Sequence, residues 1–380
     1  MPHPSAQPVD ARATQPADTA VRRRGRFAWI DRSLIVFSGV CLLIVIAGSV
    51  VQVSMGALPI ELAGVIDGLF NPAIWGDVEA WAALLLGHGE LPAIDRETLV
   101  IWTVRVPRVV SGALIGVCLS ISGAIFQAVT RNELASPYIL GISSGAGLAI
   151  LLTLIVFPTA VMSLPILAAG GGLAAFFLVY AIAWKGGVDP IRLILAGVIV
   201  GTIFGSLQTA VLLLADDIAI VKSALDWTTG SLTGNDWKQV RMILPWTVLV
   251  LALSLFAGRQ LNLLLLGDAT ARSLGMSVQR ARFLLCLLAI VAASASVAVA
   301  GIIGFVGLII PHIVRSCLGS DYRRVLIGCL FAGPALMIFS DVLARLLMNP
   351  VQIPVGIVTG VVGGAYFLYL MRRRREVGSV

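Results

Sequence analysis

The chain contains 380 residues, of which 58% are hydrophobic and 12% are charged, and its formal net charge is +7. Its apolar runs approach the roughly 20 residues that cross about 30 Å of hydrocarbon as a helix, which excludes an ordinary water-soluble protein. The positive charge does not indicate a nucleic-acid partner, because no interleaved stripe of basic and aromatic residues accompanies it.

The chain begins with a stretch rich in Ala, Pro and Arg, residues 1–33, which lacks an apolar core of its own. We predict that this stretch is a disordered cytoplasmic tail. The apolar run that follows it is too long for the core of a cleaved signal peptide, so we interpret that run as an uncleaved membrane anchor.

Residues 34–371 predict one all-α, polytopic membrane domain of about ten transmembrane helices. The eighth apolar segment is short and is expected to cross with help from its neighbours. The ten segments are Leu34–Ser54, Val109–Val129, Tyr138–Phe157, Met162–Trp184, Ile191–Leu214, Met242–Ala257, Phe283–Ala300, Gly304–Leu318, Val325–Leu347 and Pro354–Met371.

Two polar stretches are expected on the outer side of the membrane. Residues 55–107 carry acidic residues and three tryptophans, Trp75, Trp81 and Trp102, and predict short helices at the outer interface, where tryptophan is favoured. The second stretch contains Asp226–Gly234, whose glycines suit a broken helix beside a pathway.

The longest loop expected on the inner side comprises residues 258–282. Within it, Gly267–Gly275 predicts a short helix closed by glycine. From the residues alone, a helix lying on the inner leaflet and a docking site for a soluble subunit are equally good interpretations. A basic cytoplasmic tail, residues 372–380, ends the chain.

The distribution of basic residues orients this topology. If the N-terminus is cytoplasmic and the chain crosses the membrane ten times, 20 of the 27 Lys and Arg residues lie on the inner side. Because basic residues concentrate on the cytoplasmic side of membrane proteins, both termini are predicted to be cytoplasmic.

Several residues within the apolar segments have a structural and a functional interpretation. Glycines spaced by four residues predict close helix packing, although glycines in the fifth and tenth spans also suit a moving gate. Asp341 and Arg345 lie one helical turn apart and predict an ion pair. His312 follows Pro311 and is interpreted as a packing residue in preference to a proton relay.

The sequence shows no catalytic site of its own. It has no glycine-rich phosphate-binding loop, no cluster of metal ligands and no nucleophile close to a base. The spans also lack the several buried acids typical of proton-driven pumps. If the chain is a transport protein, the absence of these motifs from its sequence indicates that a partner supplies the energy for transport.

Ordered strings along almost the whole chain after residue 34 resemble the permease subunits of bacterial ABC importers for ferric siderophores, haem and cobalamin. These strings include Arg105-Val106-Pro107-Arg108, Leu140-Gly141-Ile142-Ser143-Ser144-Gly145-Ala146, Gly267-Asp268, Leu274-Gly275, Gly304-Phe305-Val306-Gly307-Leu308, Pro311-His312 and Pro354-Val355-Gly356-Ile357-Val358-Thr359-Gly360.

The resemblance implies the permease fold of type II ABC importers, with two permease chains and a substrate path between them. It implies two cytoplasmic ATPase subunits, which bind ATP and magnesium, and a periplasmic or lipid-anchored substrate-binding protein. This chain itself is expected to bind no cofactor and no metal, and to lie in the inner membrane of a bacterium. The second permease is either an identical or a related chain.

The resemblance also assigns roles to individual residues. Docking of the binding protein falls to three arginines, Arg105, Arg108 and Arg345. Coupling to the ATPase falls to Gly267, Asp268, Ala271, Arg272, Leu274 and Gly275. Pathway and gate positions are Gln127, Asn132, Leu134, Ser143, Ser144, Thr202, Gln208, Trp227, Gly230, Gly356 and Gly360. Gln352 departs from the family pattern, which often has an acid there.

The leading hypothesis is therefore a permease subunit that moves a ferric siderophore inward by alternating access. Haem or cobalamin is the alternative cargo. Two hypotheses of a different class are an ion-coupled secondary transporter that uses His312 or Asp341, and a membrane scaffold whose 258–282 loop recruits a soluble protein.

Overall fold

The computed structural model describes residues 30–56, 58–89, 91–185, 187, 189–215, 217–348 and 352–377. Within these ranges the regular elements are helices, and no β-strand occurs among them. The all-α prediction is confirmed. Most of the predicted N-terminal tail lies outside the described residues, as do the last three residues of the predicted C-terminal tail.

Each of the ten predicted spans corresponds to a helix. Eight helices in the described part of the chain are long and apolar enough to cross a membrane, whereas α7, with the π-helical turn η4 (Leu152–Val156), and α14 are shorter. The ten helices are α1 (Arg32–Ser54), α6 (Val106–Thr130), α7 (Ile142–Leu151), α8 (Leu164–Ala183), α9 (Pro190–Leu212), α11 (Trp237–Leu265), α13 (Val278–Ala300), α14 (Val306–Leu318), α15 (Tyr322–Leu346) and α16 (Val355–Val377).

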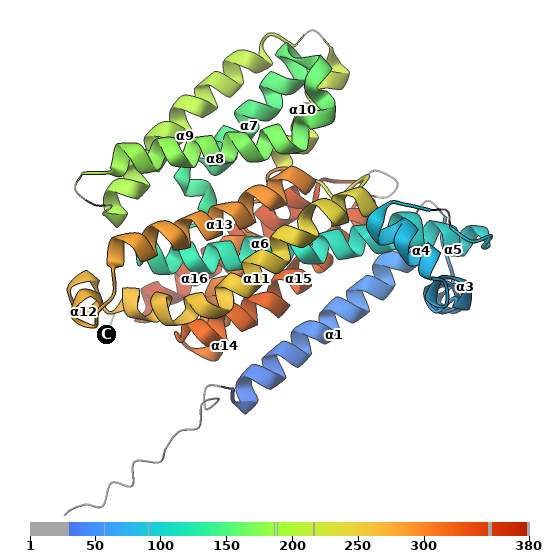
Figure 1. The fold of residues 1–380 in the computed structure, drawn as a ribbon, viewed down its shortest axis with the longest axis horizontal. Helices are drawn as coiled ribbons and strands as arrows, with labels where there is room; N and C mark the ends of the chain where they lie inside the picture. Colours follow the sequence, from blue (N-terminus) through green and yellow to red (C-terminus); the bar gives the residue numbers. More distant parts are fainter. Residues whose placement is uncertain are drawn as a thin grey trace, which may run out of the picture.

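The helices form a central bundle and a second layer. Helix α6 lies inside the bundle and packs against α11, α13, α14 and α15, while α1 packs along α15. Helices α7, α8, α9 and α10 (Ile218–Thr229) form a separate layer on the side of the bundle away from α1 (Figure 1). This layer joins the bundle mainly through α8 and α13.

Residues 55–105 form the predicted short helices. They are α2 (Leu62–Leu69), α3 (Pro72–Trp75), α4 (Val78–Trp81), η1 (Ala82–Leu86), α5 (Arg96–Val100) and η2 (Ile101–Arg105). Trp75, Trp81 and Trp102 pack edge to face with ring centroids 5.3–6.1 Å apart. The buried Trp102 indole also donates to the Gly68 carbonyl at 2.9 Å. The three tryptophans therefore form one cluster rather than three separate anchors.

The second span begins earlier than predicted. The helix runs without a break from Arg96 to Thr130, whereas hydropathy placed its start at Val109. The Asp95 carboxylate accepts a hydrogen bond from the Thr98 N–H and caps the new start. Proline lacks an N–H, and the chain accommodates Pro107 directly after the π-helical turn η2.

The two ends of the molecule are distinct. Helix α12 (Asp268–Ser273) lies at one end, called here the inner end, and α3, α4 and α5 lie at the opposite, outer end (Figure 1). The predicted short inner helix is thus confirmed, with Gly275 at φ +83° after its last turn. Helix α16 continues through Arg372 to Val377, because hydropathy marks where a membrane ends and not where a helix ends.

Close glycine packing is confirmed in α6. A methyl group added at Gly123 would collide with the Gly307 carbonyl of α14, and one at Gly116 would collide with Gly333 of α15. By contrast, added Cβ atoms at Gly205 on α9 and at Gly360 on α16 would meet nothing within 4 Å. The glycines of α6 therefore allow close packing against other helices of the same chain, whereas Gly205 of α9 and Gly360 of α16 face open space.

Candidate functional site

At the outer end, a buried carboxylate binds two arginines. The Asp341 side chain, 1% exposed, accepts hydrogen bonds from Arg108 at 2.7 and 3.1 Å and from the Gln52 amide at 2.5 Å. The Arg345 Nε lies 3.3 Å from the same carboxylate, so the predicted pair is confirmed. The more directly bonded partner is Arg108, which is 233 residues away in sequence.

Asp341, Arg105, Arg108 and Arg345 form what we call the outer cluster. Its remaining contacts connect different elements. The Arg105 guanidinium donates to the carbonyls of Val53 and Leu58, and the Arg345 Nη1 donates to the Met55 carbonyl at 3.1 Å. The side-chain Oε1 of the exposed Gln352 accepts from Arg108 at 2.9 Å and from the Thr233 hydroxyl at 3.2 Å. The three predicted docking arginines therefore meet at the outer end.

The side chains of Arg105 and Arg108 are buried, 4% and 6% exposed, and make contacts inside the chain. Their docking role stays a prediction. Reversing both to Glu would be a poor probe of that role, because reversing Arg108 would place two carboxylates together in the interior.

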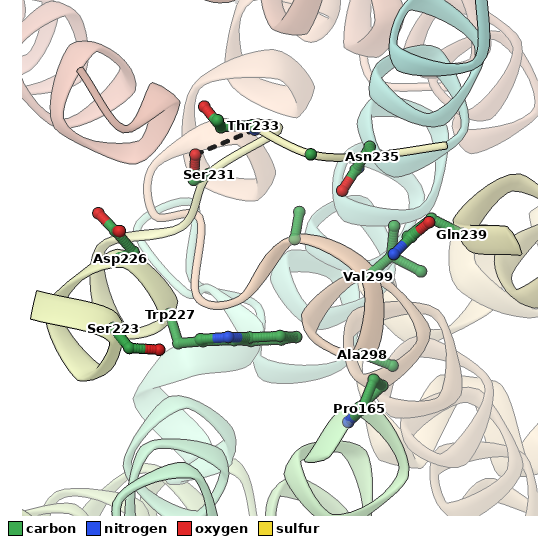
Figure 2. Close-up of a pocket in the computed structure, with 12 residues that line it drawn as sticks. Pro165, Ser223, Asp226, Trp227, Ser231, Thr233, Asn235, Gln239, Ala298 and Val299 are labelled. Atoms are coloured by element: carbon green, nitrogen blue, oxygen red, sulfur yellow. Dashed lines mark hydrogen bonds between the residues drawn. The ribbon is translucent and has the colours of Figure 1, made fainter. Parts of the chain in front are cut away.

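A pocket of about 260 Å³ lies near the outer end between α8, α10, α11 and α13. The flat Trp227 ring reaches from α10 toward α13, and the segment from Ser231 to Asn235 passes over it (Figure 2). Polar groups in the lining include Asp226, Asn235 and Gln239. The predicted broken helix is confirmed, because α10 ends at Gly230, where φ is +74°.

Beside this pocket, three chain segments meet in what we call the outer junction, formed by residues 227–231, 300–303 and 356. The Ser231 N–H donates to the Ala300 carbonyl at 2.8 Å, and the Gly356 N–H donates to the Gly230 carbonyl at 3.1 Å. Cβ atoms added at Gly301 or Gly356 would overlap backbone atoms of α10. Gly230 and Gly356, both predicted gate positions, are therefore neighbours. The outer junction connects the C-terminal ends of α10 and α13 to the first turn of α16.

The predicted pathway residues do not all lie together. The Gln208 amide of α9 donates to the Ser144 carbonyl of α7 at 2.7 Å, while Thr202 is exposed on α9. Ser143 is half-buried on α7. Gln127 is buried in the contact between α6 and α14, where its amide donates to the Leu308 carbonyl at 3.2 Å. In this conformation Gln127 contributes to packing and does not line an open surface.

At the inner end, α12 exposes some residues and buries others. Leu274, 58% exposed, and Arg272 face outward, while Ala271 is buried. The Asp268 carboxylate is ion-paired with Arg131 and lies 2.9 Å from the Nη2 of Arg282. Arg131 and Arg282 thus share one carboxylate, a connection that no local sequence pattern indicates.

A cavity of about 440 Å³ opens beside Asn132 and Leu134, two of the predicted pathway and gate positions. It lies between the loop after α6, α14 and the last part of α16, and His312 contributes to its lining. The His312 Nδ1 lies 2.8 Å from the Tyr366 hydroxyl, and its Nε2 lies 3.9 Å from Glu133. The fold therefore brings His312 near a carboxylate that the local sequence did not show.

Also at the inner end, Asp31 joins the start of α1 to α15. Its carboxylate accepts hydrogen bonds from the Ser33 hydroxyl at 2.8 Å, from the Leu34 N–H at 3.1 Å and from Arg324 at 2.5 Å. The Ser33 hydrogen bond contributes most to lowering the pKa of Asp31, and the Leu34 N–H and Arg324 lower it further. The ion pair between Asp31 and Arg324 therefore links the start of α1 to the start of α15.

Comparisons with known proteins match nearly the whole bundle. Residues 41–373 match the model of the FecCD transport family. The Fe(3+)-citrate import system permease protein YfmD of Bacillus subtilis is 37% identical over 338 residues, which cover 89% of this chain and 95% of that protein. The iron(3+)-hydroxamate import system permease protein FhuG of the same organism is 40% identical over 286 residues, covering 73% of this chain and 85% of that protein.

A solved structure has the same arrangement of helices. It is an inward-facing conformation of a metal-chelate type ABC transporter, with a TM-score of 0.75 and 26% sequence identity. The match covers 88% of this chain and 98% of that one. The similarity therefore extends over the central bundle and the second layer, and not over an isolated motif.

Proposed function

Because the chain belongs to the FecCD transport family, we propose that it carries a ferric siderophore across the inner membrane as the permease subunit of an ATP-driven importer. The observation that carries this proposal is the match to YfmD, a ferric-citrate permease, over 89% of the chain. FhuG, named for iron hydroxamate, supports an iron chelate as cargo. Haem or cobalamin is the alternative cargo within the same class.

The proposed importer contains two ATPase subunits, which bind ATP and magnesium, and a second permease chain, either identical or related. The exposed Arg272 of α12 and the exposed Leu274 directly after this helix support docking of the ATPase at the inner end. The open space beside Gly205, Gly360 and Gly364 supports close approach of the second permease to α9 and α16. This assignment places both termini of the chain on the cytoplasmic side.

The substrate-binding protein docks at the outer end in this proposal. The outer cluster contains three arginine side chains, those of Arg105, Arg108 and Arg345, and one carboxylate, that of Asp341, so it has an excess of positive charge. Because the guanidiniums of Arg105 and Arg108 are buried, this net positive charge attracts acidic groups on a partner through its electrostatic field and not through direct hydrogen bonds. Asn132 and Leu134 close the inner mouth, and the outer junction closes the outer one.

Uptake by proteoliposomes tests the proposal. The complex is reconstituted with its ATPase and binding protein, and radioactive iron is offered as a ferric hydroxamate or as ferric citrate, beside haem and cobalamin. We expect uptake of a ferric siderophore that needs both ATP and the binding protein. Uptake that a proton gradient drives without ATP would instead indicate a secondary transporter, and the absence of any uptake would favour a scaffold.

Leu274→Asp is expected to detach the ATPase. An exposed leucine that enters an apolar cleft of the partner becomes a buried charge without a counter-ion, so co-purification of the ATPase should fall at least about tenfold. Leu274→Met keeps the apolar contact and serves as the matched control. Both variants should insert into the membrane as well as the parent, and equal ATPase recovery from both would refute the docking assignment.

Gln352→Glu is expected to weaken docking of the binding protein. The new carboxylate would neutralise part of the excess positive charge beside Arg108, so affinity should fall by up to about fivefold at low salt and less at high salt. Gln352→Glu keeps an acceptor for Arg108 and Thr233, whereas Gln352→Leu removes both hydrogen bonds without adding charge and is the control. Titration of the binding protein at two salt concentrations measures the effect, and identical salt dependence for both variants would contradict the assignment.

A further inference from the structure

The carboxylate of Asp268 points into the chain, although Asp268 lies in the first turn of the exposed helix α12. It is 29% exposed and is shared between Arg131, at the end of α6, and Arg282, on α13. Arg282 is 1% exposed, and its Nη2 lies 2.9 and 3.1 Å from the two carboxylate oxygens. Asp268 therefore connects α12 to two transmembrane helices at once.

Arg131 adopts a backbone conformation that its residue type disfavours. Its φ is +50° at the C-terminal cap of α6, a left-handed position where glycine is the usual residue. An arginine persists there because its side chain is held, with Nε donating to the Leu264 carbonyl at 2.9 Å and Nη2 paired with Asp268. The guanidinium thus joins the end of α11 to the start of α12.

The three residues after Arg131 form the proposed inner mouth. The Asn132 side chain accepts from the Leu134 N–H at 2.9 Å, and the Asn132 carbonyl accepts from the Ala135 N–H at 3.1 Å. These bonds make the loop a compact turn. A displacement applied at Arg131 is therefore transmitted to Leu134.

The other side of the same loop faces α14. Glu133, 55% exposed, lies 3.9 Å from His312 Nε2 and 3.9 Å from Arg315 Nε, and the side chains of these two partners are 10% and 9% exposed. The loop therefore lies between α12 and α14, and it borders the cavity of about 440 Å³ between the loop, α14 and α16.

We propose that Asp268 is a positioning residue whose carboxylate transmits the movement of α12 to the inner-mouth loop Arg131–Leu134. This inference rests on the proposed function, in which the ATPase docks on α12. Leu274, directly after α12, and Asp268, in its first turn, then have different tasks, because Leu274 binds the ATPase while Asp268 transmits the movement to the loop.

The sharpest variant is Arg131→Gln, which separates the loop from α12 while the Asp268–Arg282 pair keeps α12 on α13. Asp268→Asn weakens both connections, Asp268→Glu restores the charge, and Arg280→Gln removes an exposed inner arginine as the matched control. Each complex is tested for ATPase co-purification, ATP hydrolysis and iron uptake. Hydrogen exchange of the backbone at residues 131–136 is compared with and without ATP and vanadate.

Arg131→Gln and Asp268→Asn should retain the ATPase and hydrolyse ATP, while uptake falls about tenfold, within the usual range for coupling between sites. The nucleotide-dependent change in exchange at residues 131–136 should disappear in both variants and return in Asp268→Glu. Arg280→Gln should behave as the parent does.

The outcomes separate this inference from the proposed function. A parent chain that binds no ATPase overturns the proposed function and this inference with it. A parent that couples normally, beside an Arg131→Gln variant that couples equally well, overturns the inference alone. Loss of ATPase binding in both Arg131→Gln and Asp268→Asn also overturns it, because the ion pairs would then only hold α12 in place.

Discussion

Replacing Asp341 by asparagine is expected to remove most of the folded protein from solubilised membranes. The carboxylate is 1% exposed and neutralises Arg108, and Arg345 lies 3.3 Å from it. Asparagine has nearly the same shape but leaves both guanidiniums without a counter-ion. Removing one partner of a buried ion pair costs about 3 to 5 kcal/mol, which is a large share of the stability of a typical protein.

Two further variants make this prediction specific. Arg345→Gln should be milder, because the hydrogen-bonded pair between Arg108 and Asp341 survives. Asp67→Asn changes an exposed carboxylate on α2 and should have no effect. Size-exclusion chromatography in detergent measures the folded fraction, and the midpoint of thermal unfolding ranks the variants. A parental midpoint for Asp341→Asn would show that the outer cluster does not stabilise the fold.

Gly123→Ala is expected to have an effect of similar size for a steric reason. The added methyl would collide with the carbonyl of Gly307, so α6 and α14 would have to separate in the middle of the bundle. Overpacking a core typically costs about 1 to 3 kcal/mol and more where backbone must move, because no side chain can rotate away. We expect little monodisperse protein and a strongly lowered unfolding midpoint.

Gly205→Ala is the matched control for this prediction. It is the same substitution in a transmembrane helix, but its Cβ meets nothing within 4 Å in this chain. The variant should fold like the parent. If a second permease packs against α9, the assembled complex should nevertheless be less abundant. Equal stability of the Gly123 and Gly205 variants would contradict the packing derived for α6.

Hydropathy and glycine placement predicted the helices well because each reports a local constraint. A bilayer requires long apolar helices, so segments such as Val278–Ala300 are visible without any knowledge of their neighbours. Gly275 at φ +83° ends the inner helix by its own backbone freedom. Hydropathy failed at Arg96 and Val377, where the helix continues beyond the apolar run.

Contacts between distant residues could not be predicted in this way. The sequence showed Asp341 with Arg345 because they are one turn apart, but it could not show Arg108 on the other side of the same carboxylate. Likewise, the position of Asp268 in a short inner helix was predictable, whereas the direction of its side chain depends on where α6 ends and where α13 begins. Such pairs follow from packing, which no local pattern encodes.

The central claim is that this chain is the permease of an ATP-driven importer. Native mass spectrometry of the chain, extracted gently from the membranes of its own host, tests it most directly. The predicted result is a complex of two ATPase copies with two permeases, either two copies of this chain or one copy and a related permease. Finding the chain without an ATPase, when cross-linking before extraction also traps none, would contradict the claim.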